Sequence, residues 1–518
     1  MNKRNYNVLF HTHTVSGITI SVILYIIFFA GAFALFKDEI TAWEKGSSLQ
    51  LEEAKNIDLD RLIKTLKDED HELYGRDIRI RYPDPKQELT VSLLASQDTC
   101  VSQEAQELAF FNIHALDYTK SEYYDFYSFG ELIYRLHFFN QIPIVGIYIA
   151  GFTALFLLFA IITGILIHWK KIVTNFYQFR PTKKWKTIWT DAHTALGVIG
   201  LPFQILYAIT SAFLCLSIFV LLPANFFMDG DQERLINEIL PANKSYKLAE
   251  ASSEPVPAIN PLLYKALNEW DDFIPTMIWI RNFGSENMKL QIDGSLHSSK
   301  SFVSTGRVIY DVFSGEEVSK VNPNNPNYTE NFYSLTQRLH YANFGGLLIK
   351  LIYFLMALVT CFVIISGVLI WLEARDKKNI SEQQRRFNKN VGYSYLSICM
   401  SMFPATAFTL LVSKCIGIGD LRKTILYGVF FGCWILLSIF FIRKKDNALT
   451  NKANLILGAI ISLLIPVANG LLSKNWFWNN ILQKQYEIFV VDLIWISLGT
   501  IAFIVYLKLR ITKSEKLT

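Results

Sequence analysis

The sequence has few charged residues and few cysteines for its length. Only 18% of its 518 residues are charged and 51% are hydrophobic, against roughly 25% charged in an average soluble domain. The scattered cysteines form no CxxC pair, which excludes a disulfide framework, a cysteine zinc site and an iron–sulfur motif. They are Cys100, Cys215, Cys361, Cys399, Cys415 and Cys433. The net charge of +5 is too small to indicate a nucleic-acid partner.

The sequence contains several long runs of apolar residues. Because unpaired backbone groups cannot be left in hydrocarbon, a membrane span needs about 20 apolar residues. Eight runs meet this need: residues 15–36, 144–167, 195–220, 347–372, 393–412, 424–442, 455–472 and 489–507. The first is too long for the core of a signal peptide, so we expect an uncleaved anchor. The sequence therefore predicts a mainly α membrane protein with eight transmembrane helices.

Basic residues indicate the sidedness of these spans. Lys3 and Arg4 precede the first span, and six lysines and arginines lie between residues 170 and 186, after the second. Because cytoplasmic loops are rich in Lys and Arg, we expect both termini in the cytoplasm. Only Lys414, Arg422 and Lys423, in a short outer loop, go against the rule. The inner connections, of about 25 residues at most, are too short for a flavin or nicotinamide domain.

This topology places two long segments outside the membrane, residues 37–135 and 221–338. Alternating apolar and polar residues at 77–82, 88–94, 277–281 and 308–313 predict strands, so we expect two small periplasmic α+β modules. The rest of the chain divides into 8–36 (first span), 136–220 (second and third spans with a cytoplasmic connection), 339–375 (fourth span) and 392–510 (a C-terminal four-helix extension).

An internal repeat relates the first four spans. Arg-Leu-His occurs at residues 135–137 and again at 338–340, and 27 residues after each histidine comes a Gly-x-Leu-Ile segment. The first and third spans also open alike, with a histidine and a glycine at 13 and 17 and again at 193 and 197. We therefore expect a duplicated helix-pair bundle whose copies are related by a pseudo-twofold axis normal to the membrane.

The repeat selects two pairs of histidines, because equivalent side chains can face each other across a twofold axis. His13 and His193 would lie near the cytoplasmic surface, and His137 and His340 near the outer surface. Two imidazoles can fill the axial positions of a haem iron, and the porphyrin suits an apolar slot between helices. The sequence therefore predicts two haem groups, one near each surface, and two such sites are what a transmembrane electron path needs.

Other side chains extend each predicted haem site. Gly17 and Gly197 follow their histidines by four residues, on the same helical face, and leave room for a macrocycle. Arg135 and Arg338 precede the outer histidines by two residues and could neutralise haem propionates. These glycines could equally serve helix packing, and these arginines could equally be interface anchors.

The other histidines fit the repeat less well. His168 could replace one of the inner ligands, but its counterpart in the repeat is Trp371, and that of His11 is Asp191. His71, His114 and His297 are expected on the solvated surface of the outer modules. From His137 to His168 a continuous helix would span about 46 Å at 1.5 Å per residue. An aromatic ring such as that of Phe28 or Tyr207 could bridge two haems.

Taken together, these motifs resemble the PepSY-associated transmembrane helix family of bacterial inner-membrane proteins, which includes ferric-siderophore reductases. The resemblance covers about residues 8–375 and includes the Gly306–Gly315 segment, which resembles a PepSY hairpin. It implies a four-helix core that binds b-type haem and reduces periplasmic ferric-siderophore iron, with a quinol or a cytoplasmic reductase as electron donor. The four spans from Tyr393 onward are a departure from the short members of this family, and they contain no histidine.

Two alternatives remain open at this point. A transporter or permease accessory, with the outer modules capturing a solute, would explain the parallel repeat and the polar residues of the last spans. There Asp492, and Pro466 with Asn469, could mark a proton, ion or quinone pathway, or they could be helix kinks and packing contacts. A transporter gives no reason for histidines that repeat at both faces. A non-catalytic sensor or inhibitor would place all function in the outer modules.

Overall fold

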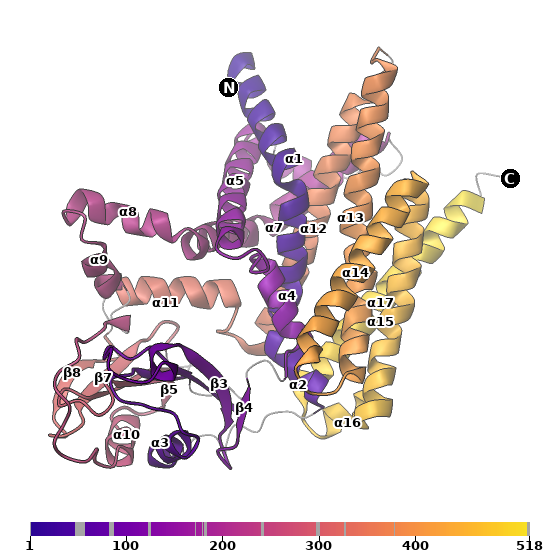
Figure 1. The fold of residues 1–518 in the computed structure, drawn as a ribbon. Coiled ribbons are helices and arrows are strands. Elements are labelled where there is room, and N and C mark those ends of the chain that lie inside the picture. Colours follow the sequence, from indigo (N-terminus) through magenta and orange to yellow (C-terminus); the bar gives the residue numbers. More distant parts are fainter. Residues whose placement is uncertain are drawn as a thin grey trace. The chain divides into compact units, whose positions relative to one another are not determined.

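The structure is a computed structural model that describes residues 2–46, 57–81, 88–122, 126–170, 172–178, 180, 184–239, 243–296, 301–325, 328–377 and 379–514. The chain divides into two compact units. One unit comprises residues 1–48, 127–220 and 340–518 and holds the long helices. The other comprises residues 49–126 and 221–339 and holds the sheet (Figure 1).

Within the described residues, eight helices are long and apolar enough to cross a membrane, which confirms the eight predicted spans. They are α1 (Lys3–Ala34), α5 (Val145–His168), α7 (Trp185–Cys215), α12 (Gly346–Arg375), α13 (Glu382–Cys415), α14 (Leu421–Lys444), α15 (Asn447–Ser473) and α17 (Tyr486–Ser514). The third span ends at Cys215 rather than at residue 220, because Leu216 leaves the helical conformation with ψ at 62°. A separate helix, α8 (Ser217–Phe227), follows it.

The spans form two adjoining groups. In the first group, α1 and α7 each pack against both α5 and α12, which closes a ring of four helices that we call the histidine bundle. In the second group, which we call the C-terminal bundle, α13 packs against α14 and α15, and α15 packs against α17. The two groups share a core, where the rings of Phe33 and Trp495 stack with centroids 5.2 Å apart.

Two short helices that we expected in the first outer module belong to the membrane unit instead. They are α2 (Lys37–Lys45) and α4 (Phe129–His137). Ile40 and Trp43 of α2 and Leu132 and Leu136 of α4 are buried in the same core as the spans. Burial of these apolar faces explains why the boundary lies near residues 48 and 127 rather than at 37 and 135.

The second unit contains one eight-stranded antiparallel sheet in the order β4-β3-β2-β1-β5-β6-β7-β8. The first segment supplies β1 (Ile78–Arg81), β2 (Glu88–Leu93), β3 (Ala109–His114) and β4 (Lys120–Glu122), and the second supplies β5 (Phe273–Arg281), β6 (Lys289–Leu296), β7 (Gly306–Asp311) and β8 (Glu317–Val321). All four predicted strands are present among them. A turn at Ser314-Gly315 joins β7 to β8, and Gly315 has a left-handed φ of 71°.

The two outer segments thus form one sheet, not two separate modules. Strands β1 and β5 pair antiparallel, with Ile78 opposite Ile280 and Ile80 opposite Ile278. This pairing removes two edges that separate modules would expose. Helices α3 (Leu59–Asp68) and α10 (Asn260–Leu267) share one core with the apolar side chains of both halves. The remaining short elements are η2 (Glu104–Gln106), α6 (Ile172–Phe176), α9 (Gln232–Ile239), α11 (Tyr328–Tyr341) and α16 (Phe477–Leu482).

Candidate functional site

The four repeated histidines form two facing pairs within the histidine bundle. His13 of α1 faces His193 of α7, with ring centroids 6.3 Å apart and ring planes at 77°. His137, the last residue of α4, faces His340 of α11, with centroids 5.9 Å apart and planes at 36°. The structure therefore brings together the pairs that the repeat predicts.

Three of the four imidazoles are held by backbone carbonyl groups. Nδ1 of His13 lies 2.8 Å from the Ala160 oxygen, and Nδ1 of His193 lies 2.9 Å from the Val363 oxygen. These two acceptors stand 23 residues after His137 and His340, so the first pair is held by equivalent positions of the two repeats. Nδ1 of His137 lies 2.8 Å from the Ile27 oxygen.

The fourth imidazole is held by a side chain. Nδ1 of His340 lies 2.9 Å from Oγ1 of Thr210, whose hydroxyl donates to the Leu206 oxygen. Carbonyl groups only accept, and the Thr210 hydrogen is already used, so each histidine must carry its proton on Nδ1. Nε2 of each ring is then left with a free lone pair, which is the state of a metal-ligating histidine.

Glycines set the space around the rings. A Cβ at Gly164 would lie 3.2 Å from Cε1 of His13, and a Cβ at Gly31 would lie 2.7 Å from Cε1 of His137. Glycine at these positions therefore lets the two rings pack directly on the helix backbone. By contrast, a Cβ at Gly17 or Gly197 would meet nothing within 4 Å. A methyl group at either position would therefore meet no neighbouring element, and the use of this space by a macrocycle stays a prediction.

The two pairs lie much closer together than 46 Å. His137 is not on a spanning helix, because α4 ends there and Phe139 turns the chain with a left-handed φ of 55°. Ala342, two residues after His340, makes the same turn with φ at 54°. Along α1, the 14 residues from His13 to Ile27, the partner of His137, span about 21 Å.

Aromatic rings lie directly beside the second pair. The ring of Tyr207 is edge-on to His340, with centroids 6.0 Å apart, and edge-on to Phe28, with centroids 5.7 Å apart. Both aromatic residues suggested by the sequence thus contact each other, next to the second pair rather than midway. The Tyr207 hydroxyl is buried and finds no hydrogen-bond partner in the described part of the chain, so a polar group is unsatisfied beside the pair.

The donor set at each pair fits a haem. Two imidazoles on opposite sides of one metal, at about 2.0 Å per metal–nitrogen bond, place their centroids about 6 Å apart. Both observed separations match this span. Among the residues that the structure describes, no group of three or more His, Cys, Asp or Glu could hold a metal ion. A macrocycle such as haem would supply the other ligands that two imidazoles leave open.

The remaining predicted residues lie at different distances from the pairs. His168 ends α5 and interacts electrostatically with His13 and His193, which places it at the same end of the bundle. His11 is exposed, and its ring is edge-on to that of Phe10. Asp191, its counterpart in the repeat, pairs with Arg180 over 2.7 Å.

The two arginines predicted for propionates have protein partners. Arg135 donates from Nε to Oε1 of Glu131 over 2.7 Å, and Lys37 pairs with the other oxygen of Glu131 over 2.5 Å. Burial raises the pKa of Glu131, but Lys37 and Arg135 outweigh it and hold the pKa below its usual value. Arg338 donates from Nη1 to the Phe302 oxygen. A propionate role for either arginine stays a prediction.

The outer histidines depart in part from expectation. His71 is not solvated: its ring stacks on Phe111 with centroids 5.3 Å apart, and Nδ1 lies 3.0 Å from Oε1 of Glu104. Apolar stacking and an ion pair explain its low exposure. His114 is one-third exposed and contacts Asp117. His297 lies outside the described residues.

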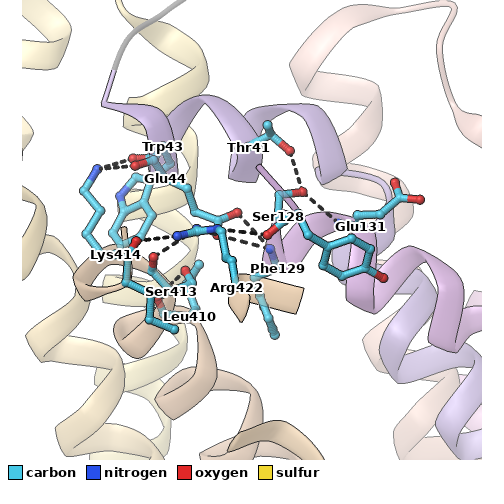
Figure 2. A network of polar contacts seen from close by, with 12 residues as sticks. Thr41, Trp43, Glu44, Ser128, Phe129, Glu131, Leu410, Ser413, Lys414 and Arg422 are labelled. Atoms are coloured by element: carbon cyan, nitrogen blue, oxygen red, sulfur yellow. Dashed lines mark hydrogen bonds and ion pairs between the residues drawn. The ribbon is translucent and has the colours of Figure 1, made fainter. Parts of the chain in front are cut away.

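A buried charge cluster was missed by the sequence reasoning. Arg422 donates from Nη2 to Oε1 of Glu44 over 2.7 Å, and both side chains are at most 2% exposed (Figure 2). Lys414 donates to the backbone oxygen of Trp43. The signal was present, since Lys414 and Arg422 go against the positive-inside pattern. They do so because they are buried at the junction of α2, α4 and the C-terminal bundle.

Comparison with known proteins agrees with this architecture. A family model described as the PepSY-associated TM region matches residues 10–374, well over half of the chain. The match includes both histidine pairs and the whole second unit and ends before the C-terminal bundle. No curated protein matches the chain significantly. The chain, a multi-pass membrane protein by its eight apolar helices, belongs to the PepSY-associated transmembrane family.

Proposed function

We propose that the protein is a b-type haem oxidoreductase of the bacterial inner membrane that passes electrons across the bilayer to periplasmic ferric-siderophore iron. The observation that carries the proposal is the state of the four histidines. Each has its Nδ1 hydrogen bonded and its Nε2 free, and they face each other in two pairs. Bound haem would supply one-electron chemistry at its iron.

Equivalent contacts support the proposed duplication. The acceptors of His13 and His193, and the glycines Gly164 and Gly367 that their rings contact, occupy equivalent positions in the two repeats. We therefore interpret the histidine bundle as two copies of a helix pair. Such an arrangement presents one imidazole from each copy to a shared site.

The chain's own residues would position and insulate the redox groups. The carbonyl groups of Ala160, Val363 and Ile27 fix the orientation of three imidazoles and increase their basicity as ligands. Phe28 and Tyr207 fill the apolar space beside the second pair and exclude water from it. The separation of about 21 Å along α1 is short enough for two wide macrocycles to approach edge to edge.

The sheet unit would bind the electron acceptor. In the topology favoured by the basic residues, this unit lies in the periplasm, next in sequence to the His137–His340 pair. We interpret its two helix-and-meander halves as PepSY-like modules. Ferric iron binds hard oxygen ligands far more tightly than ferrous iron does, so one electron would release it from a siderophore.

Reoxidation kinetics test this function. The purified protein, reduced with dithionite under nitrogen and freed of excess reductant, is mixed with a ferric trihydroxamate chelate in a stopped-flow spectrometer. We expect haem reoxidation and ferrous iron formation at a one-to-one electron ratio, at least ten times slower in His340→Ala. A reduced protein that no ferric chelate reoxidises would contradict the ferric reductase and favour another acceptor. A colourless preparation would favour the transporter.

A further inference from the structure

A line of buried polar side chains runs along α13 and α15, away from the histidine pairs. In a membrane helix pair, burying a polar side chain is costly unless the side chain is hydrogen-bonded. Seven of the polar side chains along α13 and α15 have a relative exposure of 0%, and Thr409 is one of these. We call the other six the polar column: Ser397, Ser401, Thr406, Asn454, Ser462 and Asn469.

Each residue of the polar column has a buried side-chain oxygen with no hydrogen-bond partner among the residues that the structure describes. Their neighbours show the usual alternative: Thr409 and Ser413 donate to backbone oxygens of their own helix, both over 2.7 Å. Leaving a buried polar group unsatisfied costs about 1–3 kcal/mol. Six such groups in one helix interface are explained if they hydrogen-bond to a chain of water molecules.

The two helices that carry the column, α13 and α15, run side by side in the same direction (Figure 1). A Cβ at Gly392 of α13 would contact Asn447 of α15, and a Cβ at Gly458 of α15 would contact Phe403 of α13. Both contacts join residues 55 positions apart, so the two helices keep one register. In this register the residues of the column follow one another along the helix axis in the order Ser397, Asn454, Ser401, Thr406, Ser462 and Asn469. The largest step, from Ser462 to Asn469, is about 7 residues, or about 10.5 Å.

The column ends at a buried acid. Asn469 donates to Oδ2 of Asp492 over 3.0 Å, and Trp43 donates to Oδ1 over 2.8 Å. Asn480 of α16 also donates to Oδ2, over 3.3 Å. Asp492 itself is fully buried. It can take up and release a proton, which the serine, threonine and asparagine side chains of the column cannot do at ordinary pH.

Close helix packing does not account for the column. Small residues let membrane helices approach, and Gly392, Gly458 and Gly499 do this here, with a Cβ at Gly499 only 3.0 Å from Ser462. Packing needs small side chains, however, and Asn454 and Asn469 are neither small nor apolar. Nothing in packing requires their amide oxygens to be unpaired.

We propose that the C-terminal bundle conducts protons along the polar column, with Asp492 as the proton-binding group at the end nearest α2 and α16. Protons move between water molecules held by the column and by Asp492, with no net chemical change. This activity does not depend on haem. Beyond Asp492, Lys414 and the Glu44–Arg422 pair lie at the same junction, and Glu44 accepts from the first backbone N–H of α4, the helix that carries His137 (Figure 2).

Proton flux into vesicles tests the proposal. The full chain is reconstituted into liposomes that contain a pH-sensitive dye, and a potassium gradient with valinomycin drives protons inward. We expect acidification well above that of protein-free vesicles, and a loss of at least tenfold in Asp492→Asn and in Asn454→Leu.

A matched pair of variants separates conduction from structural damage. Thr406→Val removes an unpartnered hydroxyl and should lower the flux several-fold. Thr409→Val makes the same change three residues away, where the hydroxyl bonds its own helix, and should leave the flux unchanged. If Asp492→Asn does not fold into a monodisperse protein, the comparison of the two threonine variants tests the proposal instead. Wild-type flux equal to that of empty vesicles, or equal flux in Thr406→Val and Thr409→Val, would overturn the proposal.

Discussion

Oγ1 of Thr210 lies 2.9 Å from Nδ1 of His340, which makes His340 the one paired histidine held through a side chain rather than a carbonyl group. This contact can therefore be removed by substitution. Thr210→Val leaves the Nδ1 hydrogen of His340 without an acceptor and should weaken cofactor binding at the second pair by about 10–100-fold. Redox titration should show one haem component shifted or lost and the other unchanged.

Thr210→Ser keeps the hydroxyl and serves as the control for this position. It should retain the wild-type titration. If Thr210→Val and Thr210→Ser both titrate like the wild type, the hydroxyl does not position His340.

Gly17→Ala tests whether a group occupies the space beside the first pair. In the protein alone the new Cβ would meet no atom within 4 Å. The helix should therefore be unaffected or stabilised, by up to about 1 kcal/mol from helix propensity. Haem content should nevertheless fall, because the methyl group would occupy space that the macrocycle needs. Haem content and the thermal midpoint are measured on the same preparation, and a full haem complement in Gly17→Ala would contradict a macrocycle packed on α1.

The buried Glu44–Arg422 pair should be important for stability. Glu44→Ala leaves the Arg422 guanidinium uncompensated and should lower the free energy of unfolding by about 3–5 kcal/mol. The exposed Glu373 provides a matched control, since Glu373→Ala should change the free energy of unfolding by less than about 0.5 kcal/mol. Thermal unfolding in detergent compares the two. Equal unfolding midpoints for the two variants would show that the Glu44–Arg422 ion pair adds nothing to stability.

Asp58 should make the sheet unit sensitive to acid. Its carboxylate caps α3 by accepting from the Arg61 N–H over 2.9 Å, and it also accepts from Asn260 Nδ2 over 2.7 Å. These bonds, with the Arg61 N–H first, hold the pKa of Asp58 below its usual value. A depressed carboxyl pKa adds stability above the unfolded pKa of about 4, and this stability is lost as the pH falls.

Hydrogen exchange of the α3 amides in the intact chain checks this prediction. At pH 7, Asp58→Ala should destabilise α3 by about 0.5–2 kcal/mol, the usual cost of losing an N-cap. The difference from the wild type should shrink toward pH 3. A difference that stays constant or grows as the pH falls would contradict the role assigned to the carboxylate.

The sequence was a good guide to features with a simple period or repeat. The eight apolar runs predict the eight membrane-length helices, because hydrocarbon leaves little choice of structure. The offsets that relate His13 to His193 and His137 to His340 predict which rings face each other. A repeat predicts which distant residues lie close together, whereas local secondary-structure propensity does not.

Features that depend on tertiary contacts were missed. The left-handed turn at Phe139 shortens the path between the two histidine pairs. A left-handed φ is not expected for a bulky residue such as phenylalanine, so the sequence did not predict this turn. The β1–β5 pairing joins two segments almost 200 residues apart. In the sequence, Lys414 and Arg422 look like charges of an outer loop, but both are buried. An ion pair and backbone oxygens replace the water around them.

The measurement that tests the central claim most directly is the haem content of the purified protein. A reduced-minus-oxidised visible spectrum with pyridine haemochrome quantitation is recorded for the wild type, for His137→Ala and for His193→Ala. Two pairs of facing imidazoles predict two haems per chain in the wild type and about one in each variant. A well-folded wild type that contains no haem after growth with ample iron would contradict the account.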